Sequence, residues 1–377
     1  MPGLALVTTS YPDGVAGTEA AGAFVEDLAT ALSGSIPVSV VAAGRTASVS
    51  RDGDLTVRRF RVPRLPLSLL KPHKPWHWGA IISSLRSGKT ALRDCLREDR
   101  PDHVLALWIL PSGWWAMSQT RDQGLPYSTW ALGSDVWALG RIPLVRGVLR
   151  RVLRSAEHSY ADGLLLARDV EKISGEPCSF LPSARRLSAT STSTTRAEPH
   201  YRLGFLGRWH PNKGADLLMS ALEALSDDDW NRIDSIRVCG GGPLDSLVRD
   251  GAQQLARAGR PVSIGGYLDR DEAAELIGWA DYLVLPSRIE SIPVIFSDAA
   301  QLGTALIATP VGDLPNLHSR YDFGVIASAA STESLVDAIR SALGDDATRF
   351  DAGLAAAAKD FRVDAIAERL LNELELR

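Results

Sequence analysis

Short apolar runs alternate with longer amphipathic stretches near the start of the chain. The apolar run 4–8 is followed by turn residues and then by 18–32, where apolar side chains recur at helical spacing. Another apolar run follows at 38–44. Short, continuously apolar strands that alternate with helices are typical of a parallel sheet covered by helices on both faces.

The same alternation is clearer after residue 200. Strands are predicted at 202–207, 236–240, 262–266, 282–286 and 305–310, and helices at 215–225, 273–280 and 294–303. The Ser/Thr-rich stretch 183–200 separates the two series and is interpreted as an interdomain linker. The pattern therefore predicts an α/β protein with two domains.

Length and composition are consistent with this organisation. A chain of 377 residues exceeds the size at which one core usually stops growing, and 45% hydrophobic with 23% charged residues is ordinary globular composition. Cys95, Cys178 and Cys239 have neither metal-binding nor disulfide spacing, which favours a reducing, cytoplasmic setting. We expect no signal peptide and no membrane span, since no uninterrupted apolar run approaches about 18 residues.

Charge divides the chain into unequal halves. Residues 1–200 hold 24 Lys and Arg against 18 Asp and Glu, whereas residues 201–377 hold 17 against 27. The basic stretch 141–154 alternates apolar side chains with arginines. It is either a packed helix with a solvated arginine face or a helix that lies on an anionic membrane.

Two cations follow the predicted strand 202–207. Arg208 and Lys213 lie in the loop GRWHPNKG, at the carboxyl end of that strand, where ligands bind in open α/β sheets. Their positive charge suits a diphosphate and the charge that develops when it leaves. The alternative is that both are solvated surface charges.

A second candidate loop follows the predicted strand 282–286. Glu290 lies in this loop, and Pro293 is well placed to begin a helix whose free amides, around Val294, form an anion site. Asp298 follows one turn into the helix, and both carboxylates can accept hydrogen bonds from sugar or ribose hydroxyls. Glu290 is otherwise explained as a residue that stabilises the helix start.

Taken in order, several segments carry a resemblance. FLGRWHPNKGADLLMSAL, VCGGGP and GGYLDRDEAAELIGWADYLVLPSRIESIPVIFSDAAQLGTALIATPVGDLP are similar to the nucleotide-sugar domain of the retaining glycosyltransferases of family 4. The similarity covers most of residues 202–316 and is weaker but collinear in the N-terminal half. It implies the GT-B fold, in which two Rossmann-like domains face a central cleft.

The resemblance implies a domain organisation. Residues 1–190 would form an acceptor-binding domain, and residues 200–349 a nucleotide-sugar-binding domain. The tail 350–377 would pack back on the N-terminal domain and bury Phe361, Ile366 and Leu370.

It also implies roles for individual residues. Arg208 and Lys213 would hold the donor diphosphate, and Glu290, which opens the family's Glu-x7-Glu motif, would contact the donor sugar. Asp298 would contact the ribose, and the backbone near Leu268 the base. The expected donor-binding residues are Gly14, Gly17, Gly207, Leu268, Ser291, Ile292, Pro293, Val294 and Asp298.

The sequence departs from the family pattern at two positions. The second acid of the motif is Asp298 rather than Glu, and Leu132 stands where a His often reaches the donor sugar. Nearby, Ser134 and Asp135 are candidate residues of the acceptor or sugar side. Asp135 is equally well explained as the cap of a helix that begins near Val136.

The mechanism implied by the resemblance is transfer with retention of anomeric configuration, from a nucleotide-sugar to a saccharide, lipid-linked or small-molecule acceptor. We expect no metal and no cofactor, because the protein's own cations take the stabilising role. No nucleic-acid partner is expected, whereas the N-terminal domain is a candidate for peripheral contact with the inner face of a membrane. The alternatives are a GT-B enzyme of other chemistry, such as an epimerase, and a non-catalytic nucleotide-sugar-binding protein.

Overall fold

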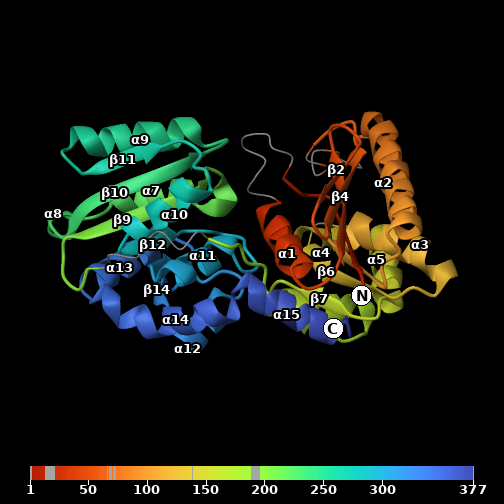
Figure 1. Cartoon of the computed structure of the whole chain (residues 1–377). Helices are drawn as coiled ribbons and strands as arrows, with labels where there is room; N and C mark the ends of the chain where they lie inside the picture. The colour runs from red at the N-terminus through yellow and green to blue at the C-terminus, as the bar shows by residue number, and fades with distance from the viewer. Residues whose placement is uncertain are drawn as a thin grey trace. The chain divides into compact units, whose positions relative to one another are not determined.

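The computed structural model describes residues 2–12, 22–65, 67, 70, 74–137, 139–187 and 196–376. The chain divides into two compact units. The first comprises Met1–Ser183 with Val363–Arg377, and the second comprises Ala184–Arg362 (Figure 1). Each unit is an α/β domain built on its own sheet, so the predicted fold class is confirmed.

The first unit contains an eight-stranded sheet with the order β3-β4-β2-β1-β5-β6-β7-β8. Its strands are β1 (Leu4–Thr8), β2 (Val38–Gly44), β3 (Ser48–Asp52), β4 (Leu55–Arg61), β5 (His103–Leu107), β6 (Tyr127–Ala131), β7 (Ser159–Ala161) and β8 (Ser179–Phe180). All neighbouring strands are parallel except β3 and β4, which form an antiparallel pair at the edge. The apolar pattern did not predict this pair, because the residues of β3 are all exposed.

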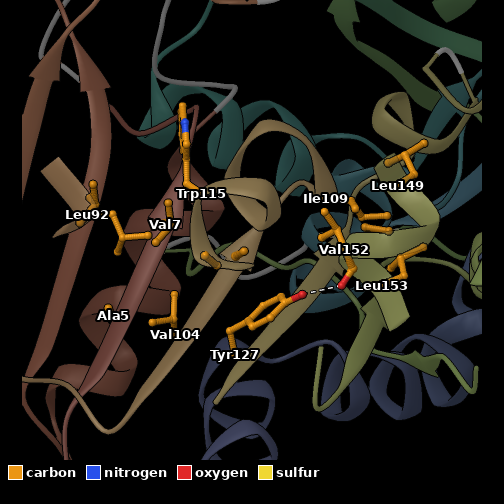
Figure 2. Close-up of a cluster of buried hydrophobic side chains, with 14 of the residues drawn as sticks. Ala5, Val7, Leu92, Val104, Ile109, Trp115, Tyr127, Leu149, Val152 and Leu153 are labelled. Carbon is orange, nitrogen blue, oxygen red and sulfur yellow. Dashed lines mark hydrogen bonds between the residues drawn. The ribbon is translucent and has the colours of Figure 1, made fainter. Parts of the chain in front are cut away.

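Helices cover both faces of this sheet. They are α1 (Ala23–Ser33), α2 (Trp78–Glu98), α3 (Trp114–Thr120), α4 (Ser134–Trp137), α5 (Pro143–Ser155), α6 (Leu164–Ser174) and α15 (Val363–Glu373). Every residue of β1 is buried, and alternate residues, such as Ala5 and Val7, join the cluster drawn in Figure 2. There, side chains of β1, β5 and β6 meet those of α2, α3 and α5, and the Tyr127 hydroxyl donates a 2.6 Å hydrogen bond to the Val152 carbonyl.

The second unit contains a six-stranded, fully parallel sheet with the order β11-β10-β9-β12-β13-β14. Its strands are β9 (Tyr201–Arg208), β10 (Ile233–Gly241), β11 (Val262–Gly265), β12 (Tyr282–Leu285), β13 (Ala305–Ala308) and β14 (Gly324–Ile326). Its helices are α7 (Ala215–Glu223), α8 (Asp227–Trp230), α9 (Asp245–Arg257), α10 (Arg270–Trp279), α11 (Val294–Leu302), α12 (Leu314–Tyr321), α13 (Thr332–Leu343) and α14 (Asp351–Asp360). All five strands predicted after residue 200 are present, and β14 is a sixth that the sequence analysis did not predict.

The C-terminal tail is shared between the two units, in contrast to the expected tail 350–377. Only α15 belongs to the first unit, where it packs on α1 and buries Ile366 and Leu370. Helix α14 packs on α11 in the second unit. Phe361 is buried there too, with its ring centroid 5.1 Å from that of Phe296, rather than in the first unit as expected.

The predicted linker 183–200 is not uniform. Residues 188–195 lie outside the described part of the chain, but Ala184 begins the second unit. The Arg185 carbonyl accepts a 3.0 Å hydrogen bond from Gln301 of α11, and the Arg186 carbonyl accepts one of 3.3 Å from Arg270 of α10. The start of the linker is therefore fastened to the second unit.

Among the helices that the structure describes, none has the length and apolar character needed to cross a bilayer.

Candidate functional site

The strand order of the second unit defines a point where ligands bind. From β9 the chain proceeds outward to β10 and β11, then returns to β12 on the other side of β9. Crevices outside the carboxyl ends of parallel strands at such a reversal are the usual ligand sites of open α/β sheets. The loops that follow β9 and β12, which hold Lys213 and Glu290, both start at this reversal.

The two loops are fastened to each other by their backbones. The Arg288 amide donates a 2.8 Å hydrogen bond to the Asn212 carbonyl. Gly214 has a φ of +70°, and a methyl group at its α-carbon would lie 1.8 Å from the Pro286 carbonyl oxygen. Only glycine permits this approach, so the Gly that follows Lys213 fixes the distance between the loops.

Lys213 and Glu290 form an ion pair across this junction. They are 77 residues apart in the chain, and both are partly buried, the Glu290 side chain being 13% exposed. The same carboxylate oxygen accepts a 3.2 Å hydrogen bond from the Ser287 hydroxyl. Both side chains therefore have a defined orientation at the carboxyl edge of the sheet.

A second ion pair supports the loop that holds Lys213. The Arg288 guanidinium donates hydrogen bonds of 2.8 and 2.9 Å to the two carboxylate oxygens of Asp216 in α7, and one of 2.7 Å to the Pro211 carbonyl. This arrangement lowers the pKa of Asp216, although its largest single influence, burial, acts in the opposite direction. The loops after β9 and β12 are thus joined by side chains as well as by backbone.

Arg208 ends strand β9 and is exposed. It stands in register with Gly241 of β10, and Gly207 stands in register with Gly240. A methyl group at Gly240 would lie 1.9 Å from the Gly207 carbonyl oxygen, so the glycine run of VCGGGP permits close approach of the two strand ends. The cation stands at the open end of the sheet, as the sequence predicts.

Helix α11 begins beside Glu290. Pro293 precedes its first residue, Val294, instead of being the first helical residue itself. Ser291 and Ile292 are buried, and the Ser291 carbonyl accepts a 3.1 Å hydrogen bond from the Asp313 amide. The first amides of a helix have no partner within the helix, so this anchored start presents a site for an anion.

Asp298 differs from what the sequence suggested. Its carboxylate is fully buried and forms an ion pair with Arg185. The Asp298 side chain has no exposed surface, and its expected contact with the ribose stays a prediction. Nothing in the sequence pointed to Arg185 as its partner, because this arginine lies in the Ser/Thr-rich stretch 183–200, which was interpreted as an interdomain linker.

Of the site residues expected in the first unit, only Asp135 has a side chain within the described part of the chain. Gly14 and Gly17 lie outside the described residues, as does the side chain of Ser134. The Asp135 carboxylate is buried and accepts hydrogen bonds from the amides of Ile109 at 2.7 Å, Val136 at 3.2 Å and Leu132 at 3.4 Å. Burial raises the pKa of Asp135 to about 6, while these amides act against the increase. The geometry is that of a residue that holds its own loop and the start of α4.

Among the described residues, no group of three or more His, Cys, Asp or Glu side chains is arranged to hold a metal ion. The groups that the second unit brings to the strand ends are Arg208, Lys213, Glu290 and the start of α11. This combination of cations and amide donors is suited to a diphosphate.

The comparisons with known proteins agree with this fold. Residues 200–345 match the family model of the glycosyl transferases group 1. Sucrose-phosphate synthase from Thermosynechococcus elongatus superposes with a TM-score of 0.74 at 15% identity, covering 100% of this chain and 99% of the other. Anabaena HepE, solved in complex with UDP-glucose, superposes with a TM-score of 0.68 at 14% identity, covering 100% of both chains. The protein therefore has the GT-B fold.

In sequence, the chain is 31% identical over 154 residues to a D-inositol 3-phosphate glycosyltransferase of Corynebacterium glutamicum. The alignment spans 40% of this chain and 37% of that relative. These similarities agree with the resemblance stated from the segments of 202–316. The matched region is the domain that carries the Lys213–Glu290 pair.

Proposed function

We propose that the protein transfers a sugar from a nucleotide-diphosphate donor to an acceptor hydroxyl, with retention of anomeric configuration and without a metal. The observation that carries the proposal is the Lys213–Glu290 pair at the reversal of the strand order, beside the start of α11. It combines a cation for the diphosphate with a carboxylate for sugar hydroxyls.

In the proposed reaction, the bond between the anomeric carbon and the diphosphate oxygen breaks. The acceptor oxygen forms the new bond on the same face of the sugar, and its proton passes to the departing diphosphate. Lys213, Arg208 and the first amides of α11 stabilise the negative charge that grows on that diphosphate. Preorganised donors of this kind supply the stabilisation that a divalent cation supplies in other transferases.

Glu290 has two roles in this proposal. Before the donor binds, it holds the Lys213 ammonium at the strand ends. With the donor bound, its second oxygen accepts hydrogen bonds from hydroxyls of the transferred sugar, while Ser287 keeps the carboxylate oriented. A carboxylate held in this way contributes to positioning of the sugar rather than to nucleophilic attack.

The donor and acceptor classes follow from the relatives by analogy. A structural neighbour was solved with UDP-glucose, and a sequence relative is named for transfer to an inositol phosphate. We propose a nucleoside diphosphate sugar as donor and a saccharide, lipid-linked or small-molecule hydroxyl as acceptor.

The test is a transfer assay with a panel of nucleotide-sugars and hydroxyl acceptors, monitored by release of nucleoside diphosphate. Release is expected only when an acceptor is present, and the anomeric coupling constant of the product in NMR spectra reports retention. Lys213→Ala and Arg208→Ala are each expected to lower kcat by about 10²-fold. Lys359→Ala provides the control. Lys359 is an exposed residue of α14 in the same unit, so the variant removes a positive charge that does not belong to the loops after β9 and β12. Near-native activity of both site variants would overturn the diphosphate assignment, and inversion would overturn the mechanism.

We also propose that α5 contacts an anionic membrane surface. Its side chains Leu144 and Val148 are 87% and 39% exposed, and Ile142, which precedes the helix, is 43% exposed. The exposed arginines of the same segment are Arg141, Arg146, Arg150, Arg151 and Arg154. Apolar side chains among arginines favour the interface of an anionic bilayer over water.

Vesicle flotation tests this contact. Binding to phosphatidylglycerol vesicles, absent with phosphatidylcholine and weakened by salt, is the expected result. Leu144→Ser is expected to weaken it, whereas Leu247→Ser, at an apolar side chain 44% exposed on α9, serves as the matched control. Equal binding to both kinds of vesicle, or none, would contradict the proposal.

A further inference from the structure

The site cation Lys213 has a counter-ion in its own unit. Its ammonium forms an ion pair with the Glu290 carboxylate, and the two side chains are 40% and 13% exposed. Lys213 and the Ser287 hydroxyl both donate to the same carboxylate oxygen, Oε1. Among the described residues, the other oxygen, Oε2, has no hydrogen-bond partner. One oxygen therefore holds the cation, and the other is left for hydroxyl donors of a ligand.

The backbone on both sides of Glu290 is held in place. The residue before it donates its amide to the loop after β9, and the Ser291 carbonyl accepts a 3.1 Å hydrogen bond from the Asp313 amide. A methyl group at the α-carbon of Gly312 would lie 2.2 Å from the Ser291 carbonyl oxygen and 2.4 Å from that of Glu290. Packing this close opposes any shift of the loop. The negative charge of Glu290 therefore stays beside an anion that binds Lys213.

A diphosphate and Glu290 compete for the same ammonium. The carboxylate also repels a second anion placed next to it, because like charges a few ångströms apart interact strongly in a partly buried site. A nucleoside diphosphate without a sugar meets this repulsion uncompensated. A nucleotide-sugar offsets it, since its sugar hydroxyls donate charge-assisted hydrogen bonds to Oε2.

We propose that Glu290 makes the site select nucleotides that carry a sugar and release those that have lost it. The inference rests on the proposed function and adds to it a specificity role and a role in product release. Once the sugar has passed to the acceptor, its hydroxyls no longer bind the carboxylate, and Glu290 recovers Lys213 from the nucleoside diphosphate. The same carboxylate thus attracts the substrate and repels the product, and specificity is the difference between the two affinities.

Isothermal calorimetry with UDP and UDP-glucose, and with GDP and GDP-mannose, tests the proposal on the native protein and on Glu290→Gln. Glutamine still accepts hydrogen bonds from hydroxyls but carries no charge. The variant is expected to bind the nucleoside diphosphate about tenfold more tightly than the native protein does, and to bind the nucleotide-sugar no more tightly. Most of the gain is expected in a slower dissociation of the diphosphate, measured by stopped-flow fluorescence.

Two further variants serve as controls. Glu290→Asp keeps the charge and is expected to show no gain in affinity for the nucleoside diphosphate. Asp337→Asn removes one negative charge of the same unit outside the site loops, since Asp337 of α13 is 78% exposed and pairs with Arg340 at 3.9 Å. It is expected to change neither affinity, and a gain equal to that of Glu290→Gln would reduce the effect to net charge and refute the inference.

The outcomes separate this inference from the proposed function. If Glu290→Gln weakens or leaves unchanged the binding of nucleoside diphosphate, the inference is refuted and the proposed function stands. If it strengthens binding of diphosphate and nucleotide-sugar by the same factor, the carboxylate does not discriminate between them, which also refutes the inference. If the native protein binds none of the four probes, both proposals fail.

Discussion

The Arg185 guanidinium forms an ion pair with the Asp298 carboxylate, 113 residues away in the chain. The Asp298 side chain is fully buried, and that of Arg185 is 18% exposed. Arg185 follows directly on the first residue of the second unit, so the pair ties the entry of the chain to α11. The second acid of the Glu-x7-Glu motif has thereby become part of the interior of the domain.

Replacement of Asp298 by Ala is expected to destabilise the second unit by about 2 kcal/mol or more, because it removes a fully buried carboxylate from its ion pair with Arg185. Thermal unfolding monitored by circular dichroism measures the change. Asp337→Ala is the control, since Asp337 is 78% exposed and pairs with Arg340 at 3.9 Å, where an exposed pair contributes at most about 1 kcal/mol. Equal destabilisation by both variants would show that the buried pair contributes no more to stability than the exposed pair.

Asp298→Glu is expected to be destabilising as well, by about 1–3 kcal/mol, since the added methylene has no room at a fully buried position. The family motif alone suggests the opposite, that the longer acid restores a ribose contact. An increase in nucleotide affinity in Asp298→Glu would instead support a ribose contact by the longer acid and would contradict the prediction from packing.

Gly214→Ala is expected to abolish transfer and to lower stability markedly, because its methyl group would meet the Pro286 carbonyl at 1.8 Å and separate the two site loops. Gly259 offers a matched comparison: its φ is +77° but nothing lies within 4 Å of the added methyl group. Gly259→Ala therefore isolates the backbone strain, roughly 1 kcal/mol. Similar activity of the two variants would mean that the loop contact does not position the site.

His103 makes the first unit sensitive to acid. Its imidazole is buried, lies 2.9 Å from the Ser128 hydroxyl, and has a pKa lowered by burial from 6.5 to about 4. As the pH falls below 6.5, the His103 imidazole binds a proton in the unfolded chain but stays neutral in the folded unit. The free energy of unfolding therefore declines until about pH 4. The full loss is about 3 kcal/mol.

Comparison of the native protein with His103→Gln isolates this effect, because the opposite contribution of Asp135 is common to both. The difference in unfolding free energy between the two proteins is expected to be constant above pH 7. Towards pH 4, the native protein is expected to lose about 3 kcal/mol of stability relative to His103→Gln. Denaturant titrations at several pH values measure it. A difference that does not vary with pH would contradict the assignment of His103 as a buried neutral imidazole.

Exhaustive treatment with EDTA is expected to leave the initial rate of transfer unchanged, because Arg208, Lys213 and the α11 amides supply the positive potential. The rate before and after dialysis, with and without added Mg²⁺ or Mn²⁺, is the measurement. A lost rate that either metal restores would count against the proposed mechanism, unless single-turnover rates stay unchanged and the metal acts only on product release.

The sequence by itself determined five of the six strands of the second unit and the first two strands of the first unit. Each short apolar run became a parallel strand, and the loops after β9 and β12 carry the predicted residues Lys213 and Glu290. This was possible because helical and strand periodicity depend on residues a few positions apart, and because the open ends of parallel strands share one edge of a sheet.

The tertiary structure alone decided which residues meet. Because β12 lies beside β9, Lys213 meets Glu290, and because the start of the second unit packs on α11, Arg185 meets Asp298. The edge strand β3 likewise left no trace in the apolar pattern. Partners such as Lys213 and Glu290 lie tens of residues apart, and the packing of whole elements, not local periodicity, brings them together.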